Sequence, residues 1–182
     1  MRIAITGATG LLGKALISQL LTNGDSVSAL TRDVQRAKEI LPLNVDVFYW
    51  DPSAGGPPPE SLQGSDVIVH LAGESVQGRW SKTKKDRILQ SRVVGTSNLV
   101  SALKAMDRPP PRLVAASAVG YYGDRGDEKL TEFSKRGKGF LSDVVSSWEG
   151  SLEPLSGSGI STIPLRFGLI LSEKGGALKQ LL

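Results

Sequence analysis

Three glycines close to the start of the chain have a spacing typical of loops that bind phosphate. Gly7, Gly10 and Gly13 follow an apolar run at residues 3–5, and apolar side chains recur at helical spacing after them. This order predicts a strand, a tight turn and a helix. In such a turn the first glycine allows a sharp exit from the strand, the second lets a pyrophosphate approach the backbone, and the third lets the helix pack on the sheet. The pattern predicts a dinucleotide site, and a tight turn without a ligand is the alternative.

Arg32 is the residue whose position could select the dinucleotide. It follows a second predicted strand at residues 26–30, where NAD-binding proteins usually carry an acidic residue for the ribose 2′-hydroxyl. A guanidinium suits a 2′-phosphate instead, so the sequence favours NADP over NAD. The alternative is an exposed loop arginine beside Asp33, which suits the N-cap of a predicted helix at residues 34–41.

Ser117 and the two tyrosines Tyr121 and Tyr122 are the candidate reacting groups. They follow a fifth predicted strand at residues 113–116, and ligands of doubly wound sheets bind at the carboxyl ends of the strands. This turn is therefore the candidate active site. His70 is the single histidine and lies on a predicted buried strand. We expect it to be a hydrogen-bonded core residue, and we predict no metal site.

Strands and helices alternate along the whole sequence. The predicted strands cover residues 3–5, 26–30, 45–50, 66–71, 113–116 and 162–171, and a long helix precedes the fifth strand. A chain of 182 residues with 40% hydrophobic content suits one well-buried domain and is too short for two. We therefore predict one NADP-binding domain over residues 1–182, an α/β three-layer, doubly wound Rossmann fold with a mostly parallel sheet.

The composition indicates which cellular compartment and which classes of binding partner to expect. The chain has no cysteine, and its first residues lead directly into a strand, so we expect a protein of the cytoplasm or an organelle interior. No apolar run reaches the roughly 20 residues of a membrane helix, which predicts no membrane partner. The net charge of +4 suits an anionic cofactor or small-molecule substrate and is too small to indicate nucleic acid.

Residues 79–92 form a basic cluster with six basic residues and one acidic residue. A solvated helix face is one interpretation of this cluster, and an anion-attracting rim near the cofactor is the other. Aromatic interleaving is limited to Trp80, which argues against single-stranded nucleic acid.

Five motifs occur in order along the chain: TGATGLLG, HLAG, SRVVGT, SAVGYYG and LRFGLIL. With them the chain resembles the extended short-chain dehydrogenase/reductases, and more narrowly the epimerase-family proteins of uncertain substrate that are sometimes described as SulA-like cell-division inhibitors. The resemblance implies a pyrophosphate held around Gly7, Thr9, Gly10, Leu11 and Leu12. It also implies that Arg32 holds the 2′-phosphate, Asp51 the adenine, Leu71, Ala72 and Gly73 the middle of the cofactor, and that Ser117 is the active-site serine.

The chain departs from this family at the Tyr-x-x-x-Lys pair that normally supplies the acid and base. When Glu149 is aligned with the glutamate that usually follows the pair, Phe140 stands in place of the tyrosine and Val144 in place of the lysine. Neither side chain can titrate. The asparagine pair common in sugar-nucleotide epimerases is likewise replaced, by Ser91 and Arg92.

Two classes of function remain open at this point. In one, the chain is an NADP-dependent oxidoreductase or epimerase acting on a carbonyl or sugar-like substrate, in which Ser117 binds the reacting oxygen and Tyr122 is the provisional proton donor. In the other, it is a non-catalytic NADP-binding regulatory module. The extended family normally continues into a C-terminal substrate lobe. We expect that lobe to be absent and the apolar ending, with Leu178, Leu181 and Leu182, to lack its cover.

Overall fold

The computed structural model describes residues 1–176 and 178, so Leu181 and Leu182 lie outside the described residues. The strands are β1 (Arg2–Thr6), β2 (Ser26–Thr31), β3 (Asp46–Tyr49), β4 (Val67–His70), β5 (Arg112–Ala118), β6 (Ser161–Phe167) and β7 (Leu171–Ser172). The α-helices are α1 (Leu11–Thr22), α2 (Val34–Ile40), α3 (Pro59–Leu62), α4 (Lys82–Lys104) and α5 (Phe140–Gly150), and the 3-10 turns are η1 (Val119–Tyr122) and η2 (Glu153–Leu155).

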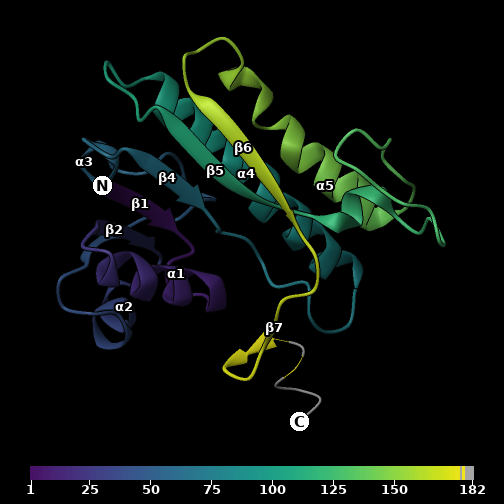
Figure 1. Ribbon diagram of the computed structural model, residues 1–182, viewed down its shortest axis with the longest axis horizontal. Helices are drawn as coiled ribbons and strands as arrows, with labels where there is room; N and C mark the ends of the chain where they lie inside the picture. The colour runs from purple at the N-terminus through teal and green to yellow at the C-terminus, as the bar shows by residue number, and fades with distance from the viewer. Residues whose placement is uncertain (177, 179–182) are drawn as a thin grey trace.

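Six strands form one sheet in which neighbouring strands are parallel, in the order β3-β2-β1-β4-β5-β6 (Figure 1). The strand order reverses at β1, which pairs with β2 on one side and with β4 on the other. In open α/β sheets this reversal opens a crevice at the carboxyl ends of the two strands. The predicted fold class is confirmed, and the six-stranded sheet is parallel throughout.

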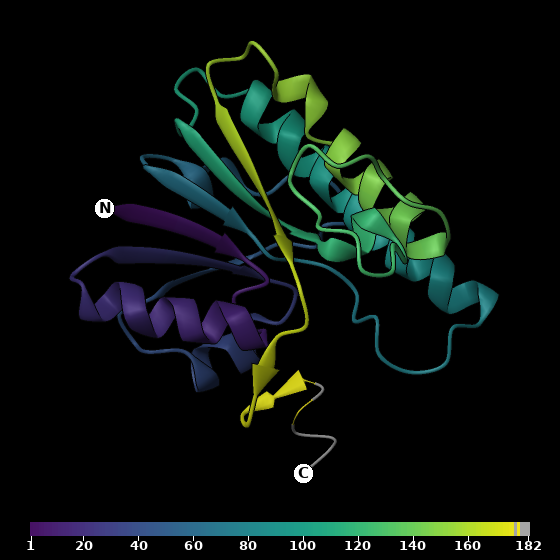
Figure 2. The same ribbon diagram turned by 45° about the vertical axis from the view of Figure 1, so that its right-hand side comes forward.

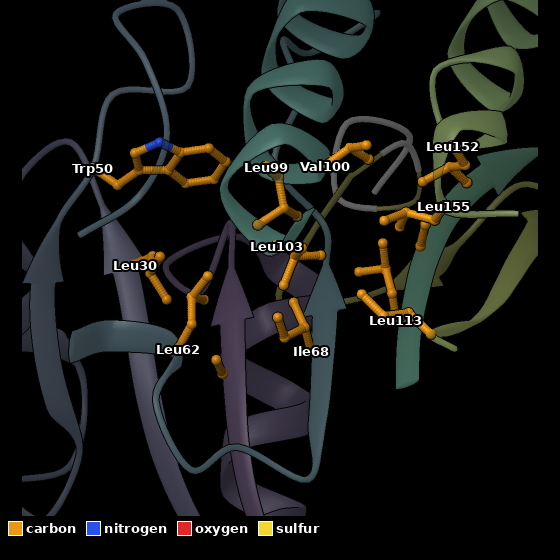
Figure 3. Packing of buried hydrophobic residues seen from close by; sticks show 13 residues of the cluster. Leu30, Trp50, Leu62, Ile68, Leu99, Val100, Leu103, Leu113, Leu152 and Leu155 are labelled. Atoms are coloured by element: carbon orange, nitrogen blue, oxygen red, sulfur yellow. The ribbon is translucent and has the colours of Figure 1, made fainter. Parts of the chain in front are cut away.

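Helices cover both faces of the sheet and make it the middle of three layers (Figure 2). On one face Ile17 of α1 and Ala37 of α2 pack with apolar side chains of β1 and β2. On the other face Leu99 and Leu103 of α4 point toward the sheet, where they meet residues such as Ile68 (Figure 3). Strands buried on both faces read as continuous apolar runs, which is why the sequence indicated parallel strands without alternation.

Capping residues mark two helix ends. The helix α1 ends at Thr22, with Asn23 as its C-cap, and Gly24 follows with φ +80°. The carboxylate of Asp33 accepts a hydrogen bond from the backbone N–H of Arg36 and so caps α2.

No helix in the described part of the chain is both long and apolar enough to cross a membrane.

Two strand ends differ from their prediction by more than one residue. The strand expected over residues 162–171 ends at Phe167, and Leu171 begins a short separate strand whose bridges to Gly175 and Gly176 are antiparallel. The apolar run hid this break, since Leu169 is 75% exposed and does not pack in the sheet. The strand β5 continues to Ala118, so Ser117 lies within the strand.

Candidate functional site

Two of the three glycines in the first turn are required by the backbone itself. Gly7 has φ +67°, a conformation that side chains with a Cβ rarely adopt, and a Cβ there would lie 2.7 Å from the carbonyl carbon of Leu71. A Cβ on Gly13 would lie 2.6 Å from the carbonyl oxygens of Gly7 and Ala8. These two glycines let β1, α1 and the end of β4 approach one another closely, as the spacing predicted.

Gly10 is different, because the fold does not demand a glycine there. Its φ of −73° and ψ of 177° are open to any residue, and it is exposed at the N-cap of α1. The one neighbour near an added Cβ is the carbonyl oxygen of Gly7 at 3.1 Å, a contact that a small shift would relieve. Space kept free on the outer side of this turn fits a ligand that approaches the backbone, as a pyrophosphate does at a helix N-terminus.

A cleft of about 270 Å³ opens beside this turn, at the carboxyl ends of β1, β2 and β4. Its wall includes eight of the cofactor-binding residues expected from the sequence: Gly7, Thr9, Gly10, Arg32, Asp51, Leu71, Ala72 and Gly73. Leu11 and Leu12 are not among its lining residues, since they begin α1. The cleft joins segments that are up to 84 residues apart in the sequence, from Gly7 to Ser91, and has the position expected for an adenosine and pyrophosphate.

Arg32 and Asp51 lie on the same side of the cleft. Arg32 is exposed. The carboxylate of Asp51 accepts hydrogen bonds from the hydroxyl of Ser53 at 2.7 Å and from its backbone N–H at 2.9 Å. These two bonds, aided by the positive charge of Arg32, hold the pKa of Asp51 below its usual value. Asp51 is therefore a charged, oriented acceptor at the rim.

His70 is a buried core residue, as expected, and it supports the wall of the cleft. Its Nδ1 lies 2.7 Å from Oγ1 of Thr6, and its Nε2 lies 3.1 Å from Oγ1 of Thr96. The Thr6 oxygen also accepts the backbone N–H groups of Leu71 and Ala72. We therefore assign the Thr6 hydrogen to the bond with Nδ1 and the imidazole hydrogen to Nε2. Burial lowers the pKa of His70 to about 4, which keeps the ring neutral.

Four side chains form a continuous polar chain at the carboxyl end of β5. Ser117 donates a hydrogen bond to Oε1 of Glu149 on α5. Arg166 on β6 donates to both carboxylate oxygens of Glu149, through Nε at 2.8 Å and Nη2 at 2.7 Å. Its Nη1 donates to the hydroxyl of Tyr122 at 2.8 Å. We call these residues the Ser117 quartet.

Burial and hydrogen bonding both shift the pKa values of the charged residues in the Ser117 quartet. Burial favours a raised pKa at Glu149, but the hydrogen bonds from Arg166 and Ser117 outweigh it and hold that pKa below its usual value. The same pairing raises the pKa of Arg166. The guanidinium also lies over the ring of Tyr121, with its central carbon 3.6 Å from the ring centroid. The pair is thus a charged, bidentate unit at neutral pH.

Phe140 and Val144 lie on α5 but make no hydrogen bond to Ser117. The ring of Phe140 packs edge-on against Trp80, with their centroids 5.6 Å apart, and lies under the ammonium group of Lys85. Val144 is buried. The α5 residue that does reach Ser117 is Glu149, which the sequence analysis used only to align the helix.

Glu149 and Arg166 are the functional candidates that sequence reasoning missed. A usable signal was present for Arg166, a charged residue within the largely apolar stretch PLRFG. Charged side chains in such positions are usually paired.

No group of three or more histidine, aspartate or glutamate residues able to hold a metal ion occurs within residues 1–176 and 178.

The fold and the cleft together define a doubly wound α/β protein of the Rossmann type, with its candidate site at the topological switch point. The sequence profile of the NAD dependent epimerase/dehydratase family matches residues 3–138. The chain belongs to this family.

Individual relatives agree with this assignment. The epimerase family protein YfhF of Bacillus subtilis is 37% identical over 176 residues, which are 96% of this chain and 57% of the relative. The structure is similar to that of the human epimerase family protein SDR39U1 with NADPH, at 30% identity and a TM-score of 0.83 over 100% of this chain and 58% of that one. It is also similar to a nucleoside-diphosphate sugar epimerase from Corynebacterium glutamicum, at 37% identity and a TM-score of 0.81 over 100% of this chain and 36% of that one. The chain thus spans between 36% and 58% of the length of these three relatives.

Proposed function

We propose that this chain binds NADP(H) in the cleft beside Gly10, as the cofactor-binding part of an oxidoreductase or epimerase. The observation that carries the proposal is the turn itself, in which a glycine that the fold does not require keeps the helix N-terminus open to a phosphate. Arg32 stands at the rim where a 2′-phosphate would lie. The human relative whose structure holds NADPH supports the same choice.

The preference for NADPH over NADH tests this proposal. We expect NADPH to bind more tightly, and the substitution Arg32→Ala to remove about tenfold or more of that preference, because a charge-assisted hydrogen bond contributes about 1.5 to 3 kcal/mol. Fluorescence titration of both nucleotides measures the two affinities. Arg108→Ala is the matched control, since Arg108 is also an exposed arginine but does not line this cleft. Equal affinities for the two nucleotides in the unchanged protein would refute the proposal.

The Ser117 quartet supports a reaction at a carbonyl or hydroxyl group. NADP(H) would supply or accept the hydride at the reacting carbon. Arg166 already donates to the Tyr122 oxygen, and no acceptor for the hydroxyl hydrogen of Tyr122 lies among the described residues. Tyr122 is largely buried, with 7% of its surface exposed. That hydrogen would pass to a substrate oxygen that reached the edge of this ring, and the guanidinium would stabilise the phenolate that remains. Ser117 donates to Glu149, so its oxygen can still accept a hydrogen bond.

A non-catalytic NADP-binding module is the second candidate. Phe140 and Val144 cannot titrate, and the quartet links four elements in a way that a purely structural brace also would. In that case the cofactor would act as a ligand that stabilises one state of the protein. The two candidates differ in whether bound NADPH is consumed.

A further inference from the structure

Arg92 is a partly buried cation at the edge of the cleft, and none of the roles described above uses it. It lies on α4 directly after Ser91, which lines the cleft. A Cβ added to Gly73, another lining residue, would lie 3.4 Å from the central guanidinium carbon of Arg92. On its other side the guanidinium lies 5.0 Å from the ring centroid of Trp148. Arg92 therefore stands between the cleft wall and α5, next in space to the helix that carries Glu149.

One side of the guanidinium is held and the other is open. Nη1 donates to the carbonyl oxygen of Glu74 at 2.9 Å and to that of Ile88 at 3.1 Å. Within residues 1–176 and 178, Nε and Nη2 of Arg92 have no hydrogen-bond partner. Neither atom is fully buried, since neither belongs to the set of buried polar atoms without a partner. Both nitrogens therefore face space that solvent or a ligand can enter. The guanidinium of Arg92 is thus fixed through Nη1 and presents the N–H donors Nε and Nη2 on its other edge.

Among the described residues, no carboxylate forms an ion pair with Arg92. The carboxylate of Glu74 accepts a hydrogen bond from Lys84 at 2.6 Å and gives Arg92 only its backbone oxygen. The carboxylate of Glu149 is occupied by Arg166 and Ser117. Burial lowers the pKa of Arg92, and the charge of Glu74 only partly opposes this. An arginine remains cationic at neutral pH, so a partly desolvated charge is left for an anion to balance.

We propose that Arg92 receives an anionic oxygen group of the substrate, a carboxylate or phosphate, beside the cofactor cleft. The inference rests on the proposed function, since it places the anion next to the bound cofactor. A planar guanidinium with two donors on its open edge matches the bidentate geometry of either group. The substrate class is thus an anionic carbonyl or hydroxyl compound, and Arg92 contributes to its specificity.

The direct test follows the Nε–H signal of Arg92 by NMR in protein labelled with ¹⁵N-arginine. Malonate and inorganic phosphate serve as probes, each titrated with and without saturating NADPH. We expect a saturable shift of the Arg92 signal that persists when NADPH is bound. Arg92→Gln should weaken malonate binding, followed at the backbone amide of Gly73, by about tenfold or more, and should change NADPH affinity by less than about threefold.

Two matched variants separate anion binding from bracing of the loop. Arg87→Gln removes an exposed arginine of the same helix and should leave malonate affinity within about twofold. Ser91→Ala removes the hydrogen bond that the backbone N–H of Glu74 donates to the Ser91 hydroxyl, and it keeps the guanidinium. Malonate affinity should survive this change. Equal losses in Ser91→Ala and Arg92→Gln would show that Arg92 only braces the loop and would overturn the proposal.

The remaining outcomes are equally decisive. An Arg92 signal that does not respond to malonate or phosphate refutes the proposal. A signal that NADPH alone shifts and that then ignores malonate assigns the guanidinium to a cofactor phosphate, which also refutes it. If NADPH fails to bind while malonate still shifts the Arg92 signal, the anion site stands and the proposed function fails.

Discussion

At the scale of single residues, the glycines of the first turn differ in the reason for which each is glycine. Gly7 is required by its positive φ and by a backbone collision, and Gly13 by backbone collisions alone. Gly10 has an ordinary backbone conformation and an open outer side. The proposed phosphate site would account for a small residue at Gly10.

Substitution of Gly10 separates binding from folding. We expect Gly10→Val to abolish detectable NADPH binding, because its side chain occupies the space of the pyrophosphate. Stability should fall by about 1 kcal/mol or less, since the one close contact can relax. Titration calorimetry and thermal unfolding measure the two effects. In contrast, Gly13→Val should disrupt the fold, and unchanged NADPH affinity in Gly10→Val would show that the turn is structural only.

His70 makes the stability of the protein depend on pH. The ring has a pKa of about 4 in the folded protein and an ordinary value near 6.5 when unfolded, so the unfolded chain binds more protons between these values. Stability therefore falls as the pH falls, by about 2 kcal/mol between pH 7.5 and pH 5. Urea unfolding at a series of pH values measures this change. His70→Asn, although less stable at pH 7.5, should lose far less over the same interval; an equal slope would place the proton uptake elsewhere.

At the scale of elements, the Ser117 quartet joins β5, η1, α5 and β6 at one point. Arg166 is central to it, since it contacts Glu149, Tyr122 and the ring of Tyr121. A bidentate guanidinium–carboxylate pair fixes orientation as well as distance. The quartet therefore sets the position of the turn that carries Tyr122 relative to Ser117.

Removal of the Glu149 charge tests this bracing. We expect Glu149→Gln to destabilise the protein by about 1 to 3 kcal/mol, because Arg166 and Ser117 lose a charged acceptor in a partly buried setting. The effect should shrink as the pH falls below the ordinary range of a glutamate, since the native carboxylate itself becomes protonated through its lowered pKa. Glu153→Gln is the exposed control and should change stability by less than about 0.5 kcal/mol. Equal effects of the two substitutions would argue against the brace.

At the scale of the whole molecule, the cleft and the quartet belong to different regions of one sheet edge. The cleft is built from β1, β2 and β4, and the quartet from β5 onward. The chain spans 57% of the length of its Bacillus subtilis relative. We expect cofactor binding to depend on the cleft. We expect any chemistry to depend on the Ser117 quartet and on how a substrate is oriented there.

We expect this chain to bind NADPH with little or no turnover. Phe140 and Val144 replace the usual acid and base, and a positioned acid commonly contributes about 10²- to 10⁴-fold. Following NADPH absorbance with a panel of aldehydes, ketones and sugar nucleotides measures turnover. Robust turnover that Tyr122→Phe abolishes would contradict this expectation and identify Tyr122 as the proton donor. Turnover insensitive to both Ser117→Ala and Tyr122→Phe would place the reaction elsewhere.

The glycine turn, the alternation of strands and helices, and eight of the residues that line the cleft could be predicted from the amino-acid sequence. Gly7, Gly10 and Arg32 could be found because each lies at a fixed short distance along the chain from a strand end, and local geometry fixes where such residues lie. The end of β6 could not be found in this way, since the apolar run containing Leu169 does not reveal that the strand stops at Phe167.

Only the tertiary structure decided which polar side chains meet. Ser117 and Glu149 are 32 residues apart, and Tyr122 and Arg166 are 44 residues apart. Their contacts depend on how α5 and β6 lie against β5. Likewise Arg92 became a candidate only when Gly73, Trp148 and its open edge were seen together. The physical reason is that hydrogen bonds and ion pairs act over a few ångströms in space, whereas sequence patterns report only the period and the ends of single elements.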